Sequence, residues 1–568
     1  MTARKCYPAG MRTRSCSSQP LLLSIACLVA TACGASTGNI SGRQSATDGG
    51  TGGASSSGGS TNGGTGATGN SGGGSNTGAA STAGGASTAG GSGNASGGAS
   101  SDGGKAPGGT GCDVPITAVD VSKPTTIVGT GTPGSCTAAA LGDAVAKGGI
   151  VTFDCGPAPA TITLTAEVAV KKDTVLDGKN LVTLSGGGAT RILHVASAWN
   201  VTTPKLTVQH LAFTKGFTTD VVNTKATDQG GAAIFREGGS LDVLDCQFTD
   251  NHCALTGQDV SGGAITSQGV GTTVIVGSTF SGNSGSDGGA VGNLGNVLTV
   301  VNSTFDGNAA TGTDGNPGNG GNGGAIVFDG SKTTMTICGS TFTKNTAGAQ
   351  GGAIFRVAYT DEPTNIDRCT FDGNSADATV GLAGALYLEN TTITMTATTL
   401  SNNKAHYGGG LWAGQSAIAN LTNVTIANNS SDQGGGFWFA NDVKGTFLSC
   451  TIAGNTSGYG QALFGASNAQ VTVKDCIFSG NDCKGYTFTG AGVNLAFGGG
   501  ASCVSGALSG DPALGPLADN GGPTETMAPG PTSPAVLAGT DCPASDQRGV
   551  ARPATQCTLG AYEVQLKE

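Results

Sequence analysis

The sequence predicts an all-β protein: a right-handed parallel β-helix (a solenoid) with an N-terminal capping helix, preceded by a disordered tether rich in Gly, Ser and Thr. Two observations predict the solenoid. Two short motifs alternate along residues 205–485, and later copies of the first place an aromatic or aliphatic residue at positions 371, 400, 426, 452 and 478, spacings of 29, 26, 26 and 26 residues. Before each copy, apolar or small residues take every second place, as at Val274, Val276 and Ser278. A coil of such strands buries its inner face only by stacking on its neighbours.

The composition limits the class of protein. The chain has 568 residues, of which 102 are glycine, and it carries 11% charged residues and a net charge of −10. Helical bundles and coiled coils do not tolerate this much glycine, and the glycines lack the regular period of collagen. Sparse Lys and Arg in an acidic chain argue against a nucleic-acid partner.

Residues 1–33 are predicted to form a secretory signal peptide. Four Lys and Arg residues within the first 14 positions precede an apolar run at 21–32 that is too short to span a membrane as a helix. Residues 30–32 suit an ordinary signal peptidase, whereas residues 30–33 resemble a bacterial lipobox, which implies lipidation of Cys33. Both alternatives predict export, either as an outer-membrane or cell-surface lipoprotein whose lipid is its only membrane contact, or as a secreted protein.

Residues 34–111 are expected to form a disordered linker. They are almost entirely Gly, Ser, Thr, Ala and Asn, with 29 glycines in 78 positions. Nothing in this stretch can bury a core that would offset the loss of chain entropy. A Gly/Ser coil of this length spans about 50 Å on average, which suits a folded domain held away from an anchor.

Residues 112–204 are expected to hold the N-terminal cap and the first coils. Residues 137–147 have the apolar spacing of a helix, with Thr137 placed to cap its start and Gly148 and Gly149 to end it. Strands are expected at 150–153, 161–165, 174–176 and 182–184. A helix laid over the open end of the stack would cover its strand edge and apolar interior.

The repeats occupy residues 205–502. The first motif runs from Cys246 to Asn251 and consists of Cys, Ser or Thr, any residue, Phe, Ile or Leu, two further residues and Asn. Its Asn recurs as Asn283, Asn308, Asn345, Asn374, Asn403, Asn429, Asn455 and Asn481. The second motif is Gly-Gly, then Ala or Gly, then an apolar residue, and it begins at Gly262, Gly288, Gly323, Gly351, Gly408 and Gly434. We expect the Asn to adopt the left-handed conformation at a corner and to form a side-chain ladder, and the glycines to permit bends where a side chain would clash.

Two family resemblances follow from these motifs. Over residues 205–485 the alternating motifs resemble the repeats of chlamydial polymorphic outer-membrane proteins, which implies a pectin-lyase-like β-helix and an adhesive role. Residues 503–568 resemble the bacterial choice-of-anchor Q domain through Asp519-Asn520-Gly521-Gly522-Pro523-Thr524-Glu525-Thr526, Ser533-Pro534-Ala535, Asp546-Gln547-Arg548-Gly549, Arg552-Pro553 and Leu559-Gly560-Ala561-Tyr562-Glu563. That resemblance implies a β-helical surface protein and no established reaction.

The cysteines suit an exported protein. Proximity in the sequence favours disulfides between Cys136 and Cys155 and between Cys542 and Cys557, with Cys246 and Cys253, and Cys483 and Cys503, as further candidate pairs. Cys369, Cys450 and Cys476 share one inward repeat position, where they form either a buried ladder or disulfides between neighbouring coils. No Cys-x-x-Cys pair and no spaced histidines indicate a metal site, and no cofactor is expected.

A stripe of aromatic residues is the candidate ligand-binding site. Two places after the Ala or Gly of the repeat, five successive coils carry Phe355, Tyr387, Trp412, Trp438 and Phe464. Because the residues before them fit an inward column, alternation places the aromatic side chains outside, stacked about 4.8 Å apart. An exposed stripe of this kind suits sugar rings or a partner surface. The alternatives are that the phase is reversed or that another segment covers the stripe.

The function we expect is binding or adhesion to polysaccharide or another cell-surface ligand, by a monomer and without catalysis. A polysaccharide lyase or glycoside hydrolase on the same solenoid is the alternative, and a purely structural coat component is a third. Such enzymes need clustered carboxylates. The sequence aligns few charges on successive coils, so it assigns no catalytic residue.

Overall fold

The computed structural model describes residues 111–218, 229–315, 318–466 and 468–566. The chain is divided into two units, Met1–Ala95 and Ser96–Glu568, and all described residues belong to the second. The predicted signal peptide with Cys33, and the predicted linker up to residue 110, lie outside the described residues and stay predictions.

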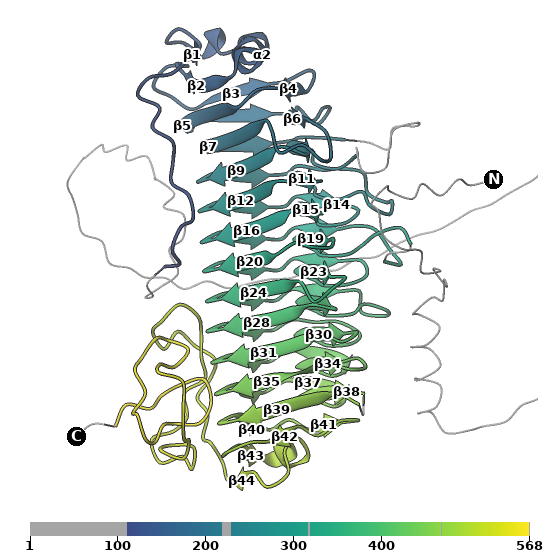
Figure 1. Cartoon of the computed structure of the whole chain (residues 1–568), viewed down its shortest axis with the longest axis vertical. Helices are drawn as coiled ribbons and strands as arrows, with labels where there is room; N and C mark the ends of the chain where they lie inside the picture. Colours follow the sequence, from purple (N-terminus) through teal and green to yellow (C-terminus); the bar gives the residue numbers. More distant parts are fainter. Residues whose placement is uncertain (1–110, 219–228, 316–317, 467, 567–568) are drawn as a thin grey trace, which may run out of the picture. The chain divides into compact units, whose positions relative to one another are not determined.

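The second unit is a right-handed parallel β-helix, as the sequence predicts (Figure 1). Each strand pairs in parallel with its counterpart on the next coil, and the strands form a 26-stranded sheet, a 12-stranded sheet and two short sheets. The 26-stranded sheet consists of two rows that share β5 and β7. One continuous apolar core runs between these surfaces through the stack.

The first row comprises β1 (Thr126–Val128), β2 (Gly149–Phe153), β5 (Thr174–Ser185), β7 (Lys205–Thr214), β9 (Ser240–Leu244), β12 (Thr272–Val276), β16 (Val297–Val301), β20 (Met335–Cys338), β24 (Pro363–Asp367), β28 (Thr392–Thr396), β31 (Ile418–Thr422), β35 (Lys444–Leu448), β39 (Gln470–Lys474) and β42 (Thr489–Gly490). The second row adds β3 (Ala160–Thr163), β10 (Gln247–Thr249), β13 (Thr279–Ser281), β17 (Thr304–Asp306), β21 (Thr341–Thr343), β25 (Thr370–Asp372), β29 (Thr399–Ser401), β32 (Thr425–Ala427), β36 (Thr451–Ala453), β40 (Ile477–Ser479), β43 (Leu495–Phe497) and β44 (Leu508–Ser509).

The twelve-stranded sheet comprises β4 (Val168–Val170), β6 (Leu193–Ala196), β8 (Ile234–Glu237), β11 (Ile265–Gln268), β15 (Val291–Leu294), β19 (Ile326–Asp329), β23 (Ile354–Val357), β27 (Leu386–Glu389), β30 (Leu411–Gly414), β34 (Phe437–Phe439), β38 (Leu463–Gly465) and β41 (Cys483–Lys484). The short sheets are β14 (Ser284–Gly285), β18 (Ala309–Ala310), β22 (Thr346–Ala347) and β26 (Ser375–Ala376), and β33 (Ser430–Gln433) with β37 (Thr456–Tyr459). Two 3₁₀ turns, η1 (Pro133–Ser135) and η3 (Gly498–Ser502), complete the elements with α2 below.

The capping helix α2 (Ala138–Lys147) forms where the sequence predicts it. The Thr137 side chain accepts a hydrogen bond from the Ala140 amide at 3.2 Å, and Gly148 ends the helix with a positive φ of 76°. Three apolar residues on one face (Leu141, Ala144 and Val145) are buried in the main core. The helix packs on β1, β2 and β4, and it therefore covers the open end of the coil stack.

The predicted asparagine ladder is present and fully buried. At each step, one Asn side chain accepts from the amide and the side chain of the Asn on the preceding coil, as Asn345 does from Asn308 at 3.0 and 2.9 Å. The left-handed conformation expected of the Asn belongs instead to the residue before it, such as Lys344 with a φ of 53° or Gly307 with a φ of 62°. This residue forms the turn, so the Asn side chain can form hydrogen bonds with the Asn residues of the preceding and following coils.

Aromatic rings fill the core beside the ladder. Six phenylalanines stack nearly parallel with centroids 4.6 to 4.9 Å apart: Phe213, Phe248, Phe280, Phe305, Phe342 and Phe371. Aliphatic residues take this position on the next three coils, as Leu400, Ile426 and Ile452, and Phe478 takes it on the coil after them. The paired glycines are needed where coils approach: a Cβ on Gly289 would lie 2.2 Å from the carbonyl oxygen of Gly324 on the next coil.

The C-terminal segment, residues 503–566, is held against the second row by buried hydrogen bonds. The fully buried Gln547 is central: its Nε2 donates to the hydroxyls of Thr399 and Thr524 at 2.8 and 2.7 Å, and its Oε1 accepts from Thr425 at 2.7 Å. Nearby, the hydroxyl of Thr399 donates to the carbonyl of Glu525 at 2.6 Å. In Figure 1 this yellow segment lies beside the later coils.

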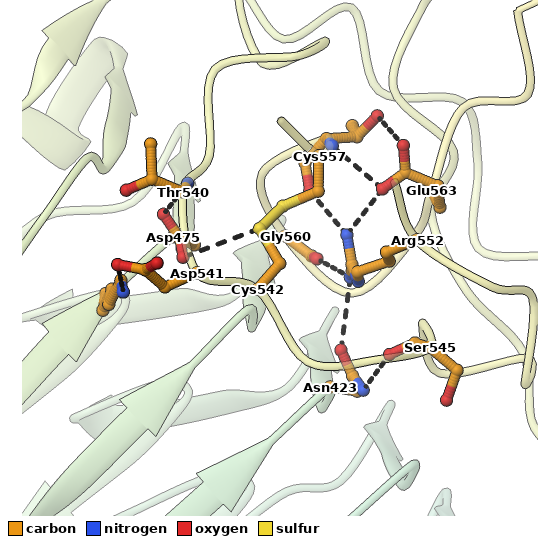
Figure 2. Close-up of a disulfide and its surroundings, with 12 residues drawn as sticks. Asn423, Asp475, Thr540, Asp541, Cys542, Ser545, Arg552, Cys557, Gly560 and Glu563 are labelled. Carbon is orange, nitrogen blue, oxygen red and sulfur yellow. Dashed lines mark hydrogen bonds and ion pairs between the residues drawn. A yellow bond between two sulfur atoms is a disulfide. The ribbon is translucent and has the colours of Figure 1, made fainter. Parts of the chain in front are cut away.

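A buried ion pair stabilises the same segment (Figure 2). Arg552 and Glu563 lie 2.9 Å apart with both side chains 1% exposed. Arg552 also donates to Asn423 of the solenoid at 3.2 Å, and Asn423 donates to the carbonyl of Ser545 at 2.8 Å. The motifs behind the choice-of-anchor Q resemblance therefore include the residues that fasten this segment to the coils, although the resemblance itself stays a prediction.

Four disulfides stabilise the described residues: Cys112 with Cys338, Cys136 with Cys155, Cys483 with Cys503, and Cys542 with Cys557. The pairing of Cys246 with Cys253 is wrong, because Cys246 lies in the main core and Cys253 in a separate small cluster. Cys369, Cys450 and Cys476 are buried thiols, which favours the ladder alternative over disulfides between coils. Among the described residues, no helix has the length and apolarity needed to cross a membrane.

Candidate functional site: the outer face of the twelve-stranded sheet

The predicted aromatic stripe lies on the outer side of the twelve-stranded sheet. Strand register aligns Phe355, Tyr387, Trp412, Trp438 and Phe464 on consecutive coils. The residues before them, from Ile354 to Leu463, belong to the main core, whereas the first three stripe residues belong to a separate apolar cluster. Alternation along the strands therefore gives the direction of these side chains correctly.

The first three residues of the stripe are buried, which corrects the expectation that they are exposed. Phe355, Tyr387 and Trp412 are 6%, 4% and 1% exposed. Their rings stack on one another at 4.8 and 4.3 Å, nearly parallel, so each ring covers the face of the next. Leu382 and Tyr407, from the turns that precede the sheet strands, pack against them. This part of the stripe is a second small core rather than a binding surface.

The later end of the stripe is open. Trp438 and Phe464 are half-buried, and two tyrosines join them: Tyr407, half-buried, and Tyr459, which is 48% exposed. The rings of Trp438 and Phe464 lie 5.9 Å apart and are tilted by 34°, and those of Tyr459 and Phe464 lie 5.5 Å apart at 53°. Tilting leaves part of each ring face uncovered. We call these four residues the aromatic patch.

Sequence reasoning missed the two tyrosines of the aromatic patch. Tyr407 and Tyr459 each come directly before the glycine that opens the second motif or its variant, at Gly408 and Gly460. Register aligns them, through Gln433, on three consecutive coils. An aromatic residue repeated at this place was the available signal, because it lies beside the outward column of the stripe.

Polar groups surround the aromatic patch. Gln433 lies between the two tyrosines in register, and His406 pairs with the exposed Asp432 at 2.9 Å. Lys484, on the next coil, aligns with Phe464 and is exposed. The indole Nε1 of Trp438 is buried and has no hydrogen-bond partner among the described residues, so this tryptophan offers its ring rather than its N–H. The patch combines ring surface with hydroxyl, amide and charged groups.

Carboxyl groups on this face do not converge into a catalytic cluster among the described residues. Asp329 and Glu389 share an outward column but are two coils apart, about 10 Å at the usual strand spacing. Glu389 accepts a hydrogen bond from the Tyr387 hydroxyl at 2.6 Å, and burial raises the pKa of both groups. Within the described ranges, the one group of three metal-ligand side chains contains the disulfide-bonded Cys112 and Cys338.

The fold and its repeats define a right-handed parallel β-helix protein, and comparison with known proteins agrees. The family model described as "Right handed beta helix region" matches residues 324–502. Among solved structures, the chain is similar to PfbA, a surface adhesin of Streptococcus pneumoniae, with 12% identity over 69% of this chain and 96% of that one and a TM-score of 0.32. No curated protein matches the sequence.

Proposed function

We propose that this protein is an exported, surface-held binding protein whose aromatic patch contacts the sugar rings of an extended polysaccharide. The observation that carries the proposal is the cluster of four partly exposed aromatic rings on successive coils, two from strands of the twelve-stranded sheet and two from the segments just before strands of the same sheet. Aromatic ring faces suit the apolar faces of sugars, and exposed apolar groups gathered in one place mark binding surfaces. The repeat of the coils suits a ligand that is itself a repeating chain.

The polar surroundings and the cysteine chemistry support the same proposal. Gln433, Asp432 and Tyr459 offer amide, carboxylate and hydroxyl groups to sugar hydroxyls at the edge of the aromatic patch. Four disulfides favour an oxidising compartment, in keeping with the export predicted from the N-terminus. The lipid anchor at Cys33, the monomeric state and the adhesive role belong to this proposal.

The test is a glycan-array screen of the full exported chain, followed by affinity measurements on the double variant Trp438→Ala/Tyr459→Ala. We expect the double variant to bind the selected glycan more than about tenfold less tightly, equivalent to about 1.4 kcal/mol, and to remain folded, which thermal unfolding checks. Tyr359→Ala is the matched control, because Tyr359 is a 56% exposed tyrosine outside the patch. Equal binding by the double variant and the control would contradict the proposal.

The variant Trp412→Ala distinguishes a loss of stability from a loss of glycan binding. Because Trp412 is 1% exposed and packed in the second small core, Trp412→Ala should lower the free energy of unfolding by about 3–5 kcal/mol. Its removal should affect glycan binding only through folding. The alternative function, a polysaccharide lyase or glycoside hydrolase, is tested on the same samples by the release of reducing or unsaturated sugar ends, and such release would replace the binding-only proposal.

A further inference from the structure

A pocket of about 730 Å³ lies at the N-terminal end of the twelve-stranded sheet, away from the aromatic patch. Its walls include Glu167, Arg191, His194, Phe217, Phe235 and Glu237. His194, Phe235 and Glu237 come from the outward columns of β6 and β8, and Glu167 directly precedes β4. The volume is in the range of small-ligand sites, which is about 300–1,000 Å³.

Glu167 is held in its ionised form, and each of its carboxylate oxygens has a hydrogen-bond partner. One carboxylate oxygen lies 3.1 Å from Nδ1 of His194, and the other accepts from Arg191 at 2.9 Å. The hydrogen bond from His194, with the nearby charge of Arg191, lowers the pKa of Glu167 to about 2 despite its partial burial. This carboxylate therefore orients His194 and Arg191, and Arg191 offsets its charge.

All three nitrogens of Arg191 donate hydrogen bonds within the protein. Its Nε donates to the carbonyl of Gly231 at 3.2 Å and its Nη2 to the carbonyl of Gly230 at 3.0 Å, while Nη1 is bonded to Glu167. The guanidinium also lies over the ring of Phe235, 4.6 Å from its centroid. These contacts fix the guanidinium against Glu167 and the backbone at the pocket wall.

Glu237 is the other charged residue of the pocket wall. Its side chain is half-buried at the pocket wall, and it has no hydrogen-bond or ion-pair partner among the described residues. Arg191 offsets the charge of Glu167, and Glu237 adds a carboxylate that no described residue offsets. Half-buried Phe217 adds apolar surface, and threonines at 165 and 190 line the same walls. The pocket is therefore built for a ligand that brings a cation together with hydroxyl groups.

We propose that this pocket binds an amino-sugar unit, with Glu237 as the counter-charge of its protonated amine and Phe217 beside the ring. The carboxylate accepts charge-assisted hydrogen bonds from the ammonium group, the strongest contact this pocket offers. This inference concerns a separate site and does not depend on sugar binding at the aromatic patch. It predicts that the protein prefers free amines to N-acetylated or acidic sugars at this end of the sheet.

The experiment titrates the full exported chain, at neutral pH, with glucosamine oligomers and with N-acetylglucosamine oligomers of the same length. Calorimetry should show tighter binding of the glucosamine oligomers, and Glu237→Gln should weaken it by about tenfold or more while leaving the N-acetylated oligomers unaffected. Asp143→Asn is the matched control, because it removes an exposed carboxylate from α2 at the same end of the stack. Thermal unfolding of both variants checks that they are folded.

Two outcomes would overturn the inference. Equal affinity for the amine and N-acetylated oligomers would show that the charge of the ligand is not recognised. Unchanged amine binding by Glu237→Gln would show that this carboxylate is not the counter-charge. The double variant of the aromatic patch should retain the amine-selective binding; if it loses that binding, the amine site belongs to the patch and this pocket is not its location.

Discussion

Replacing one asparagine in the middle of the buried ladder should destabilise the solenoid strongly. Asn345 makes four side-chain hydrogen bonds. It accepts from the amide and the side chain of Asn308 at 3.0 and 2.9 Å, and it donates to the carbonyl of Phe305 at 3.0 Å and to the side chain of Asn374 at 2.9 Å. All four are buried, so Asn345→Ala removes them where no water replaces them.

The size of the effect follows from these contacts. A buried hydrogen bond contributes about 1 kcal/mol net, so four bonds amount to about 4 kcal/mol. The amide of Asn308 loses its acceptor and stays buried, which costs about 1–3 kcal/mol more. We therefore expect the free energy of unfolding to fall by about 5–7 kcal/mol, which is large against the usual 5–15 kcal/mol of a folded domain.

Chemical denaturation of the purified chain measures the loss, and amide hydrogen exchange locates it. In a stack of coils each repeat interacts with its neighbours, so exchange at Asn308 and Asn345 should accelerate most. Asn420→Ala is the control: Asn420 is half-buried and accepts one hydrogen bond, from Thr446 at 3.1 Å, so it should lose about 1 kcal/mol or less. If both variants unfold alike, the ladder does not stabilise the fold as argued.

Two further predictions concern charged groups. Burial raises the pKa of Asp287 from 3.8 to about 7, so its ionisation destabilises the folded state as the pH rises through this range. Asp287→Asn should therefore raise Tm at alkaline pH and change it little at acidic pH. Thermal unfolding at a series of pH values measures both effects. A pH-independent effect would contradict this cause. Glu563→Ala leaves Arg552 buried without its carboxylate partner, which should lower the free energy of unfolding by about 3–5 kcal/mol. Limited proteolysis should then cut residues 503–566 of this variant. Glu563→Gln, which keeps a hydrogen-bond acceptor, should be cut more slowly. Equal protection of the wild type and Glu563→Ala would refute a role for the ion pair in fastening the segment.

The repeat motifs were sufficient to predict the fold because their information is local. Alternation of apolar residues gives the inward face, and the recurrence of the ladder asparagine fixes where each coil returns to its starting position. The same reasoning placed the left-handed residue one position too late. The side chain of the ladder Asn must point along the stack to reach the next coil, so Lys344 or Gly307 turns the corner before it.

The disulfides show where local reasoning ends. Cys136 and Cys155 lie 19 residues apart and Cys542 and Cys557 lie 15 apart, and proximity suggested both pairs. The bond that joins Cys112 to Cys338 spans 226 residues, and only the path of the chain along the coils brings its partners together. No spacing rule in the sequence indicates that path.

The exposure of the aromatic stripe depends on a second column of residues beside it. The alternation of inward and outward residues along a strand does not predict the content of this second column. The place before the first glycine of the second motif, where one coil has Ala383 in place of that glycine, carries Leu382, Tyr407, Gln433 and Tyr459 on consecutive coils. Leu382 and Tyr407 cover the early rings, whereas Gln433 leaves Trp438 half-open and Tyr459 extends the surface. Stacking acts in the same direction, since parallel rings one strand spacing apart hide each other's faces. A regular aromatic column is thus a core element where it is most regular, and it leaves ring surface open to a ligand only where tilting and a polar neighbour interrupt it.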